Sequence, residues 1–202
     1  MALDNRARYA RIAWLYDLLD APFERRYRPG RELIGAASMG LTLELGAGTG
    51  KSFPYYGQHA RVIASDLSWQ MLAQAARRVR PSIRALLVAD AAGLPLRDNS
   101  VETVVATFVC CVQDDPRPAI DEIARVLRPR GQALFLEFVL PRRGWERMML
   151  RSLAPILHAL YGVHLGHDLP SLLRAAGLDV REVRAIWAPM VQTFVAAKPL
   201  DQ

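Results

Sequence analysis

The sequence predicts an α/β fold, namely a doubly wound, Rossmann-like sheet of seven strands that closes with an antiparallel hairpin. Three observations support this prediction. Apolar stretches of strand length alternate with helical stretches from Leu41 to Val139, which is typical of a parallel sheet with helices on both faces. A glycine-rich turn follows the first apolar stretch. Two final apolar stretches, at 180–187 and 191–197, indicate a hairpin at the edge of the sheet.

Each element follows from a local pattern. Five strands are predicted before residue 140, at 41–45, 61–65, 83–88, 103–108 and 133–138, with helices between them near 68–79 and 116–126. A later helix at 169–176 ends at Gly177, a residue type that is common just after a helix. Because no repeat or linker separates these elements, we expect one domain over 1–202, made of N-terminal helices or a lid at 1–40, a ligand-binding core at 41–140, a helical cap at 141–168 and a final helix and hairpin at 169–202.

Two basic segments that carry aromatic residues flank the predicted core. Residues 6–19 predict an amphipathic helix that Pro22 ends, and a second helix over 23–39 either packs on the sheet or covers the ligand site as a lid. The insertion at 141–167 carries four arginines near helical spacing, with Trp145, Met148, Met149 and Leu153 able to share the opposite side. We interpret it as a substrate cap or a helix at a membrane surface, with an ordinary core helix as the alternative.

The composition limits the cellular context. The 202 residues carry a net charge of +6, nearly all from arginine, since Lys51 and Lys198 are the only lysines. This charge indicates an anionic partner such as nucleic acid, acidic lipid or an acidic substrate, unless it reflects genome composition or thermal adaptation. No run of about twenty uncharged apolar residues and no secretory signal is present. The adjacent Cys110 and Cys111 cannot easily pair, so we expect a reduced, cytoplasmic protein.

The turn after the first strand has the sequence Glu44-Leu45-Gly46-Ala47-Gly48-Thr49-Gly50. Glycine adopts positive φ and has no Cβ, so a ligand can lie directly on this backbone. A helix is expected to follow, with its first N–H groups directed at that ligand. A phosphate-binding loop would need glycine at position 45 and a dinucleotide fingerprint would need it at 51, so neither matches. A glycine-rich turn without any ligand is the alternative.

Asp66 ends the second predicted strand, twenty residues after Gly46. In a βαβ unit this spacing places a carboxylate at the strand tip, where it can accept hydrogen bonds from both ribose hydroxyls of a nucleoside. The alternative is an aspartate that only caps the helix beginning near Ser68. The pattern suits several adenosine-containing ligands equally, so it supports the fold more than it identifies the ligand.

Four motifs in order resemble those of class I S-adenosylmethionine (SAM)-dependent methyltransferases, and the resemblance covers nearly the whole chain. They are Glu44–Gly50, Asp66–Met71, Ala89–Ser100 and Val126–Gln132. The third is similar to the family's Asp-Ala-x-x-Leu-Pro-Phe-x-Asp-x-Ser segment. The fourth is similar to its Val-Leu-Lys/Arg-Pro-Gly-Gly turn, where this chain has Arg130 in place of the first glycine. The resemblance implies SAM as cofactor, S-adenosylhomocysteine as its product, and no metal.

The resemblance also implies which residues bind SAM. The loop glycines would line the methionine and ribose, and Glu44 would orient the loop and the SAM amino group. Asp66 would hold the ribose hydroxyls, Asp90 would contact the adenine edge, and Phe108 would lie near the sulfonium. Tyr16 resembles N-terminal tyrosines that close over SAM, and it is the one catalytic candidate. The implied cofactor-binding set is Tyr16, Glu44, Gly46, Ala47, Gly48, Gly50, Asp66, Leu67, Met71, Asp90, Ala91 and Phe108.

Within this family, segment 108–114, the strand end at Phe138 and the basic insertion resemble bacterial phosphatidylethanolamine N-methyltransferases. They also resemble membrane-associated thiol methyltransferases and, more distantly, ubiquinone/menaquinone C-methyltransferases. The first resemblance implies a phospholipid substrate or an anionic membrane surface as partner, and a peripheral location on the inner face of the membrane. Base-amino nucleic-acid methyltransferases need an Asp/Asn-Pro-Pro-aromatic turn where this chain has 108–111, so we expect no nucleic-acid partner.

Several functional alternatives stay open at this point. An amine acceptor must lose a proton, to water or to a Tyr, His or Asp side chain. We interpret His158, His164 and His167 as surface or structural residues, and both cysteines as core residues. A non-catalytic SAM- or membrane-binding module is an alternative from another class, and a nicotinamide oxidoreductase is a remote one. The acceptor, the number of methyl groups added and the oligomeric state are not predicted.

Overall fold

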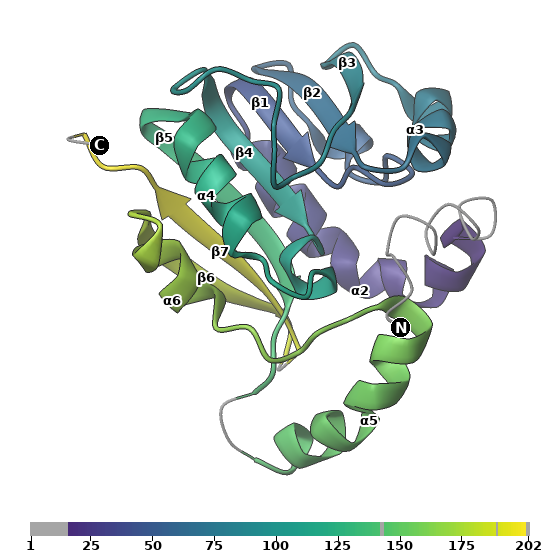
Figure 1. Cartoon of the computed structure of the whole chain (residues 1–202). Coiled ribbons are helices and arrows are strands. Elements are labelled where there is room, and N and C mark those ends of the chain that lie inside the picture. The colour runs from purple at the N-terminus through teal and green to yellow at the C-terminus, as the bar shows by residue number, and fades with distance from the viewer. Residues whose placement is uncertain (1–15, 142–143, 189, 201–202) are drawn as a thin grey trace.

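The computed structural model describes residues 16–141, 144–188 and 190–200 of the 202-residue chain. Within these residues, seven strands form one sheet in the order β3-β2-β1-β4-β5-β7-β6 (Figure 1). β1 to β5 pair in parallel, and β7 pairs antiparallel with both β5 and β6. The sheet confirms the predicted fold class and the closing hairpin. The strands are β1 (Gly40–Leu45), β2 (Ala60–Asp66), β3 (Ile83–Val88), β4 (Val101–Thr107), β5 (Leu127–Phe138), β6 (Asp179–Trp187) and β7 (Val191–Ala197).

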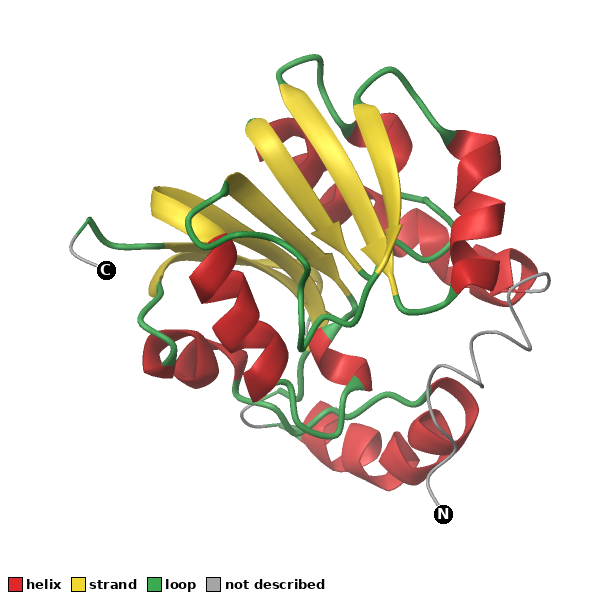
Figure 2. Ribbon diagram, turned by 45° about the horizontal axis from the view of Figure 1, so that its top comes forward, coloured by secondary structure: helices red, strands yellow, loops and turns green. Residues whose placement is uncertain are grey.

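Helices cover both faces of this sheet (Figure 2). Side chains of α4 and α6 pack on one face, and those of α2, α3 and η1 pack on the other. The described helices are α2 (Tyr16–Ala37), α3 (Trp69–Ala75), α4 (Arg117–Val126), α5 (Trp145–Tyr161) and α6 (Leu169–Ala175), with 3-10 turns η1 (Phe53–Tyr55), η2 (Ala76–Arg78) and η3 (Cys110–Val112).

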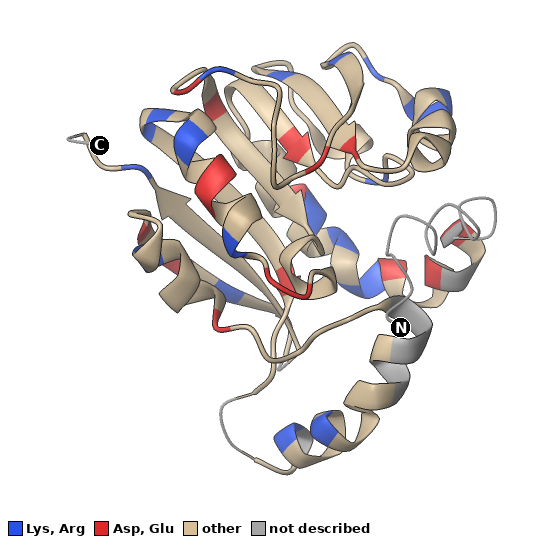
Figure 3. Ribbon diagram, viewed as in Figure 1, with Lys and Arg blue, Asp and Glu red and all other residues tan. Residues whose placement is uncertain are grey.

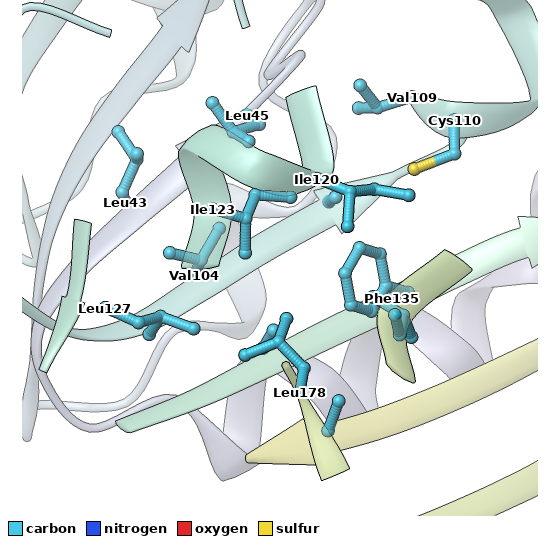
Figure 4. Packing of buried hydrophobic residues seen from close by; sticks show 14 of the residues in the cluster. Leu43, Leu45, Val104, Val109, Cys110, Ile120, Ile123, Leu127, Phe135 and Leu178 are labelled. Carbon is cyan, nitrogen blue, oxygen red and sulfur yellow. The ribbon is translucent and has the colours of Figure 1, made fainter. Parts of the chain in front are cut away.

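The sheet divides the core in two, because successive side chains of a strand point to opposite faces. Val104 of β4 belongs to the cluster with α4 and α6, whereas the next residue, Val105, belongs to the cluster with α2 and α3. Figure 4 shows the first cluster, in which Ile120 and Ile123 of α4 pack with Phe135 of β5. Full burial of such a side chain is worth about 1.5–3 kcal/mol. These contacts hold the strand ends in place.

One prediction about the N-terminal segment was wrong. Pro22 does not end a helix, since α2 continues through both Pro22 and Pro29. A proline inside a helix removes one hydrogen bond and crowds the preceding turn. Here Tyr27 and Ile34 are buried against the sheet, so tertiary packing favours a continuous helix. Most of the predicted first helix, at 6–19, lies outside the described residues.

The α-helix predicted directly after the glycine turn is absent. Residues 49–52 form turns and lead into the short 3-10 turn η1, and the next α-helix is α3, beyond β2. Phe53 is fully buried, and its ring lies against Gly50. Burying this ring bends the chain back toward β2 before an α-helix can form.

The insertion after β5 forms the predicted helix, α5, which stands off from the sheet in Figure 1. Its Leu150 packs with Cys111, Val163 and Leu165 in a third, smaller cluster. This cluster joins α5 to η3, the 3-10 turn that follows β4. Among the described residues, no helix is both long enough and apolar enough to cross a membrane.

Candidate functional site

The candidate site lies at the carboxyl ends of β1, β2 and β4. The strand order reverses there, because the chain returns from β3 to place β4 on the other side of β1. Open α/β sheets bind ligands at such a switch point. A cavity of about 740 Å³ occupies this position and extends from the glycine turn to α5.

The glycines of the turn all have left-handed backbones, with φ of +60° at Gly46, +55° at Gly48 and +79° at Gly50. A Cβ on Gly46 would lie 2.6 Å from Val109 Cγ2, and one on Gly50 would lie 2.8 Å from the ring of Phe53. A Cβ on Gly48 would meet only a carbonyl oxygen, at 4.0 Å. Gly46 and Gly50 are therefore required by packing, whereas Gly48 presents bare backbone to the cavity.

Asp66, at the end of β2, connects the turn to the following helix. Its Oδ2 accepts a hydrogen bond from the Gly48 N–H and its Oδ1 accepts one from the Ser68 N–H, both at 2.8 Å. Burial raises the pKa of Asp66, while these backbone N–H groups act in the opposite direction. The residue that caps α3 is Ser68, whose Oγ accepts from the Met71 N–H. Asp66 is thus not the helix cap, and it lies on the cavity wall.

The fold brings most of the predicted cofactor-binding residues to one cavity. Ala47 and Gly50 are buried within the turn instead, and the side chain of Tyr16 lies outside the described part of the structure. For every residue of the predicted set, contact with SAM stays a prediction. The predicted residues that line the cavity are Gly46, Gly48, Asp66, Leu67, Met71, Asp90, Ala91 and Phe108.

Glu44 lies beneath the turn rather than on the cavity wall, and its side chain is almost fully buried. Burial raises the pKa of Glu44 to about 7, against the opposite influence of the Tyr56 and Ser52 hydroxyls and the Arg31 guanidinium. Its Oε2 is buried without a hydrogen-bond partner. In this position Glu44 supports the turn from below, and its predicted contact with the SAM amino group is untested.

α2 presents carboxylates to the other side of the glycine turn. Asp17 Oδ1 accepts a hydrogen bond from Thr49 Oγ1 at 2.7 Å, and Arg78 donates both to Asp17 and to the Thr49 carbonyl. Lys51 Nζ lies within 4 Å of three carboxylates of α2, those of Asp17, Asp20 and Glu24. The first half of α2 therefore covers the turn as a lid, while the second half packs on the sheet.

The turn after β4 forms the opposite wall of the cavity. Phe108 has φ of +56°, a conformation that is uncommon for a side chain other than glycine. Its N–H donates to the Leu136 carbonyl at 2.8 Å, and the chain then turns into η3. Strained backbone of this kind is often found at binding sites.

Glu137 of β5 holds this turn, and the sequence analysis missed it. Its Oε1 accepts hydrogen bonds from the Val109 and Cys110 N–H groups, at 2.9 and 2.8 Å, and its Oε2 accepts from Cys111 at 3.2 Å. Burial raises the pKa of Glu137 to about 7, although these donors act against it. The signal in the sequence was a single carboxylate in an apolar strand. Both cysteines are buried, as predicted.

The end of the cavity away from the glycine turn is apolar and aromatic. The ring centroid of Tyr27 lies 4.8 Å from that of Phe108, 5.8 Å from Phe138 and 6.2 Å from Trp187. Burial raises the pKa of Tyr27 well above its usual value, so the phenol keeps its proton. The cap and the segment after it complete this surface with Met149, Leu150, Leu153, Val163 and Leu165.

Besides Asp66 and Asp90, the carboxylates of Asp20, Asp114 and Asp115 line the cavity. Asp114 Oδ1 lies 3.0 Å from His164 Nε2, and the His164 ring lies beside those of His158 and His167, with centroids 4.5 and 5.8 Å apart. Burial and the neighbouring imidazoles lower the pKa of His164 despite Asp114. Among the described residues, no three or more such side chains are arranged to hold a metal ion.

Comparison with known proteins agrees with this geometry. Residues 43–135 match the methyltransferase domain family. A demethylmenaquinone methyltransferase of Clavibacter sepedonicus is 33% identical over 179 residues, which cover 78% of this chain and 73% of that protein. A phosphatidylethanolamine N-methyltransferase of Cereibacter sphaeroides is 34% identical over 147 residues, covering 71% and 72%. A thiol S-methyltransferase of Rattus norvegicus is 29% identical over 166 residues, covering 79% and 67%.

Solved structures share the fold. A SAM-dependent methyltransferase from Thermotoga maritima superposes with a TM-score of 0.71 at 18% identity, covering 96% of this chain and 100% of that one. A Haemonchus contortus phosphoethanolamine N-methyltransferase, solved with phosphomonomethylethanolamine and S-adenosylhomocysteine, gives a TM-score of 0.71 at 16% identity, covering 98% of this chain and 61% of that one.

The chain therefore belongs to the class I SAM-dependent methyltransferases, and its cofactor is SAM, which leaves as S-adenosylhomocysteine. The residues fit this cofactor. The bare backbone at Gly48 and the carboxylate of Asp66 face one cavity, where a nucleoside can lie on the first and bond to the second.

Proposed function

We propose that this methyltransferase N-methylates phosphatidylethanolamine and its partly methylated forms. One observation carries the proposal: a single cavity joins the glycine turn to an apolar compartment, and carboxylates also line this cavity. The apolar compartment suits the acyl and glycerol part of a lipid. Of these carboxylates, Asp114 suits a cationic amine headgroup, because Asp20 and Asp115 already pair with Lys51 and Arg117.

The chemistry required of the protein is modest. When bound, SAM supplies a methyl group on a positively charged sulfur. The chain's own residues must then hold the acceptor in line with that methyl group and keep water out. Such alignment can be worth about 7–11 kcal/mol. The aromatic wall of Tyr27, Phe108 and Phe138 serves both purposes, because it is rigid and apolar.

An ammonium acceptor must also release one proton before each transfer. Asp114 lines the cavity beside His164, and its side chain is largely exposed, so a proton that it accepts can pass to the imidazole or to solvent. Burial and the neighbouring imidazoles lower the pKa of His164, which favours the neutral imidazole beside Asp114. This pair therefore supports an amine acceptor.

A quinone C-methyltransferase or a thiol S-methyltransferase is the second candidate. The aromatic wall also suits a planar quinol ring, and relatives of this chain carry both names. A SAM-binding module without catalysis is the candidate from another class.

The proposal is tested by offering purified protein methyl-labelled SAM with phosphatidylethanolamine, demethylmenaquinol or a small thiol, each in neutral detergent micelles. We expect label in mono- and dimethylated phosphatidylethanolamine. Label only in the quinol or the thiol would overturn the lipid assignment. No labelled product, although SAM raises the melting temperature, would favour the non-catalytic module.

The role of Asp114 has its own test. Asp114→Asn should lower kcat about 10²-fold at pH 7, because general-base catalysis typically contributes 10²–10⁴-fold. The loss should shrink at higher pH, where more of the acceptor amine is already neutral. Asp121→Asn, on the exposed side of α4, is the matched control and should leave the pH profile unchanged. If kcat depended on pH in the same way in the wild type and in Asp114→Asn, the proposed role of Asp114 would be excluded.

A further inference from the structure

Among the described side chains near the start of α5, some apolar ones line the cavity and others are exposed to solvent. Met149, Leu150 and Leu153 line the cavity. Trp145 and Met148, near the start of the same helix, are 67% and 71% exposed. Large apolar side chains that stay exposed together on a protruding helix are typical of an interaction surface.

The exposed side of α5 is also basic, because Met148 lies beside Arg147 and Arg151 rather than on the side opposite the arginines, where the sequence pattern predicted it. Arg147 and Arg151 lie one helical turn apart and, with Gly144, Met148 and Ser152, line a small surface hollow. Arg147 Nη1 donates to the Pro141 carbonyl at 2.8 Å, which orients the guanidinium, and Arg151 is exposed. Figure 3 shows basic segments, in blue, near the start of α5. The insertion from 141 to 167 contains four arginines and a single acidic residue, so its charge is positive.

We propose that this side of α5 docks on an anionic phospholipid bilayer. The hollow between Arg147 and Arg151 receives a lipid phosphate, for which paired guanidinium groups are well suited. Trp145 and Met148 enter the interface, where an indole ring places its apolar body among the lipids and its N–H toward water. We define the α5 docking face as Trp145, Arg147, Met148 and Arg151.

The placement of the cavity strengthens the choice of a bilayer over a soluble partner. Met149 and Leu153 line the cavity and are also about 40% exposed, so α5 forms a wall between the docking face and the acceptor compartment. A lipid held at the α5 docking face needs to pass only one helix to bring its headgroup to the site. This step deepens the proposed function and rests on it, whereas the docking itself does not.

The docking is tested by sedimentation with vesicles, without acceptor turnover. We use phosphatidylcholine vesicles with and without about one third phosphatidylglycerol. We expect binding to the anionic vesicles and a clear loss on raising the salt concentration. Since each basic residue near such a surface contributes about 1 kcal/mol, Arg151→Glu should weaken binding about tenfold or more. Arg77→Glu, exposed on η2, is the matched charge control and should bind as the wild type does.

Tryptophan fluorescence gives a second measurement. Anionic vesicles should shift the wild-type emission to the blue, and this shift should be absent in Trp145→Phe and retained in Trp69→Phe. Trp69 is 60% exposed on α3, so it is a matched control. An equal rise in melting temperature with SAM would show that each variant is folded.

Three outcomes would overturn the proposal. They are equal binding to neutral and anionic vesicles, a blue shift that survives Trp145→Phe, and a wild-type dimer that Arg151→Glu converts to a monomer, since the face would then bind a second copy. At constant ionic strength, inorganic phosphate should not abolish vesicle binding, because Trp145 and Met148 also enter the interface. If docking is observed but phosphatidylethanolamine in micelles is not methylated, the proposed substrate fails while the docking face stands.

Discussion

At the scale of single residues, the site depends on backbone conformations that most side chains avoid. Phe108 at the cavity wall and Arg130 at the turn in β5 have φ of +56° and +65°. In the sequence, Arg130 stands where the family motif usually has glycine. The structure shows that the backbone at this position has the left-handed conformation that glycine favours. Gly131 beside it cannot be replaced, because a Cβ there would lie 2.8 Å from the Arg128 carbonyl oxygen.

The glycine turn gives a prediction that separates packing from ligand contact. Gly46→Ala should lower the free energy of unfolding by about 2–3 kcal/mol, because it adds an overlap with Val109 to the cost of a left-handed alanine. Gly48→Ala should cost about 1–2 kcal/mol of stability, from the backbone alone. It should weaken SAM binding at least tenfold, since its Cβ enters the cavity.

These two variants are compared by urea unfolding and by titration calorimetry with SAM. The pair is its own control, because both alanines carry the same left-handed strain. Equal losses of stability, or unchanged SAM affinity in Gly48→Ala, would show that the assignment of the two glycines is incorrect.

At the scale of elements, α2 acts as a lid because its acidic face meets the glycine turn. Lys51 Nζ lies 2.5 Å from Asp20 Oδ2 and within 4 Å of two further carboxylates of the helix. Replacing Lys51 leaves carboxylates close together and partly buried, which costs about 1–3 kcal/mol locally.

We therefore expect Lys51→Met to increase hydrogen exchange in residues 17–24 and to accelerate SAM dissociation about tenfold. Hydrogen-exchange mass spectrometry and stopped-flow fluorescence measure the two effects. Arg28→Met is the control on the same helix, since Arg28 pairs with Glu32 on the exposed side. If both variants exchange alike, the ion pairs do not hold the lid.

A pH dependence is expected from the turn that Glu137 holds. Because burial raises the pKa of Glu137 from its ordinary value to about 7, the folded state binds a proton that the unfolded state has already released. The free energy of unfolding should therefore fall as pH rises from about 4.5 to about 7, and should then level off.

Glu137→Gln should remove this contribution, on the order of 2 kcal/mol between pH 5 and pH 8. Urea unfolding of both proteins across this range measures the difference in slope. Burial also raises the pKa of Glu44 to about 7, so both the wild type and Glu137→Gln keep the part of the pH dependence of stability that comes from Glu44. Parallel pH profiles for the two proteins would contradict the buried-carboxylate explanation.

At the scale of the whole molecule, the cofactor should stabilise the fold because elements from both sides of the switch point line the cavity that it is predicted to occupy. S-adenosylhomocysteine at a hundred times its Kd should add about 2.7 kcal/mol to the free energy of unfolding. For a chain of this length, the melting temperature should rise by about 5–10 °C.

Scanning calorimetry with S-adenosylhomocysteine, with SAM and with NAD at equal concentrations checks this expectation. NAD is the control and should leave the melting temperature unchanged. Stabilisation by NAD but not by the SAM pair would contradict the assignment of the cofactor.

The sequence predicted the parts that depend on local periodicity and on glycine chemistry. Strand–helix alternation, the turn at Gly46–Gly50, the carboxylate at Asp66 and the final hairpin all correspond to elements of the structure. These signals are local, since each is contained within a few neighbouring residues whose backbone preferences are well defined.

Only the tertiary structure decided the features that join distant segments. It showed that α2 continues past Pro22, that Glu137 holds the turn after β4, and that Asp114 lies against His164. It also showed that α5 closes the far end of the cavity. No local pattern encodes such pairings, because they arise when the sheet brings together residues far apart in the chain. The sequence determined the fold and the cofactor class, and the packing of the chain determined the shape of the acceptor compartment.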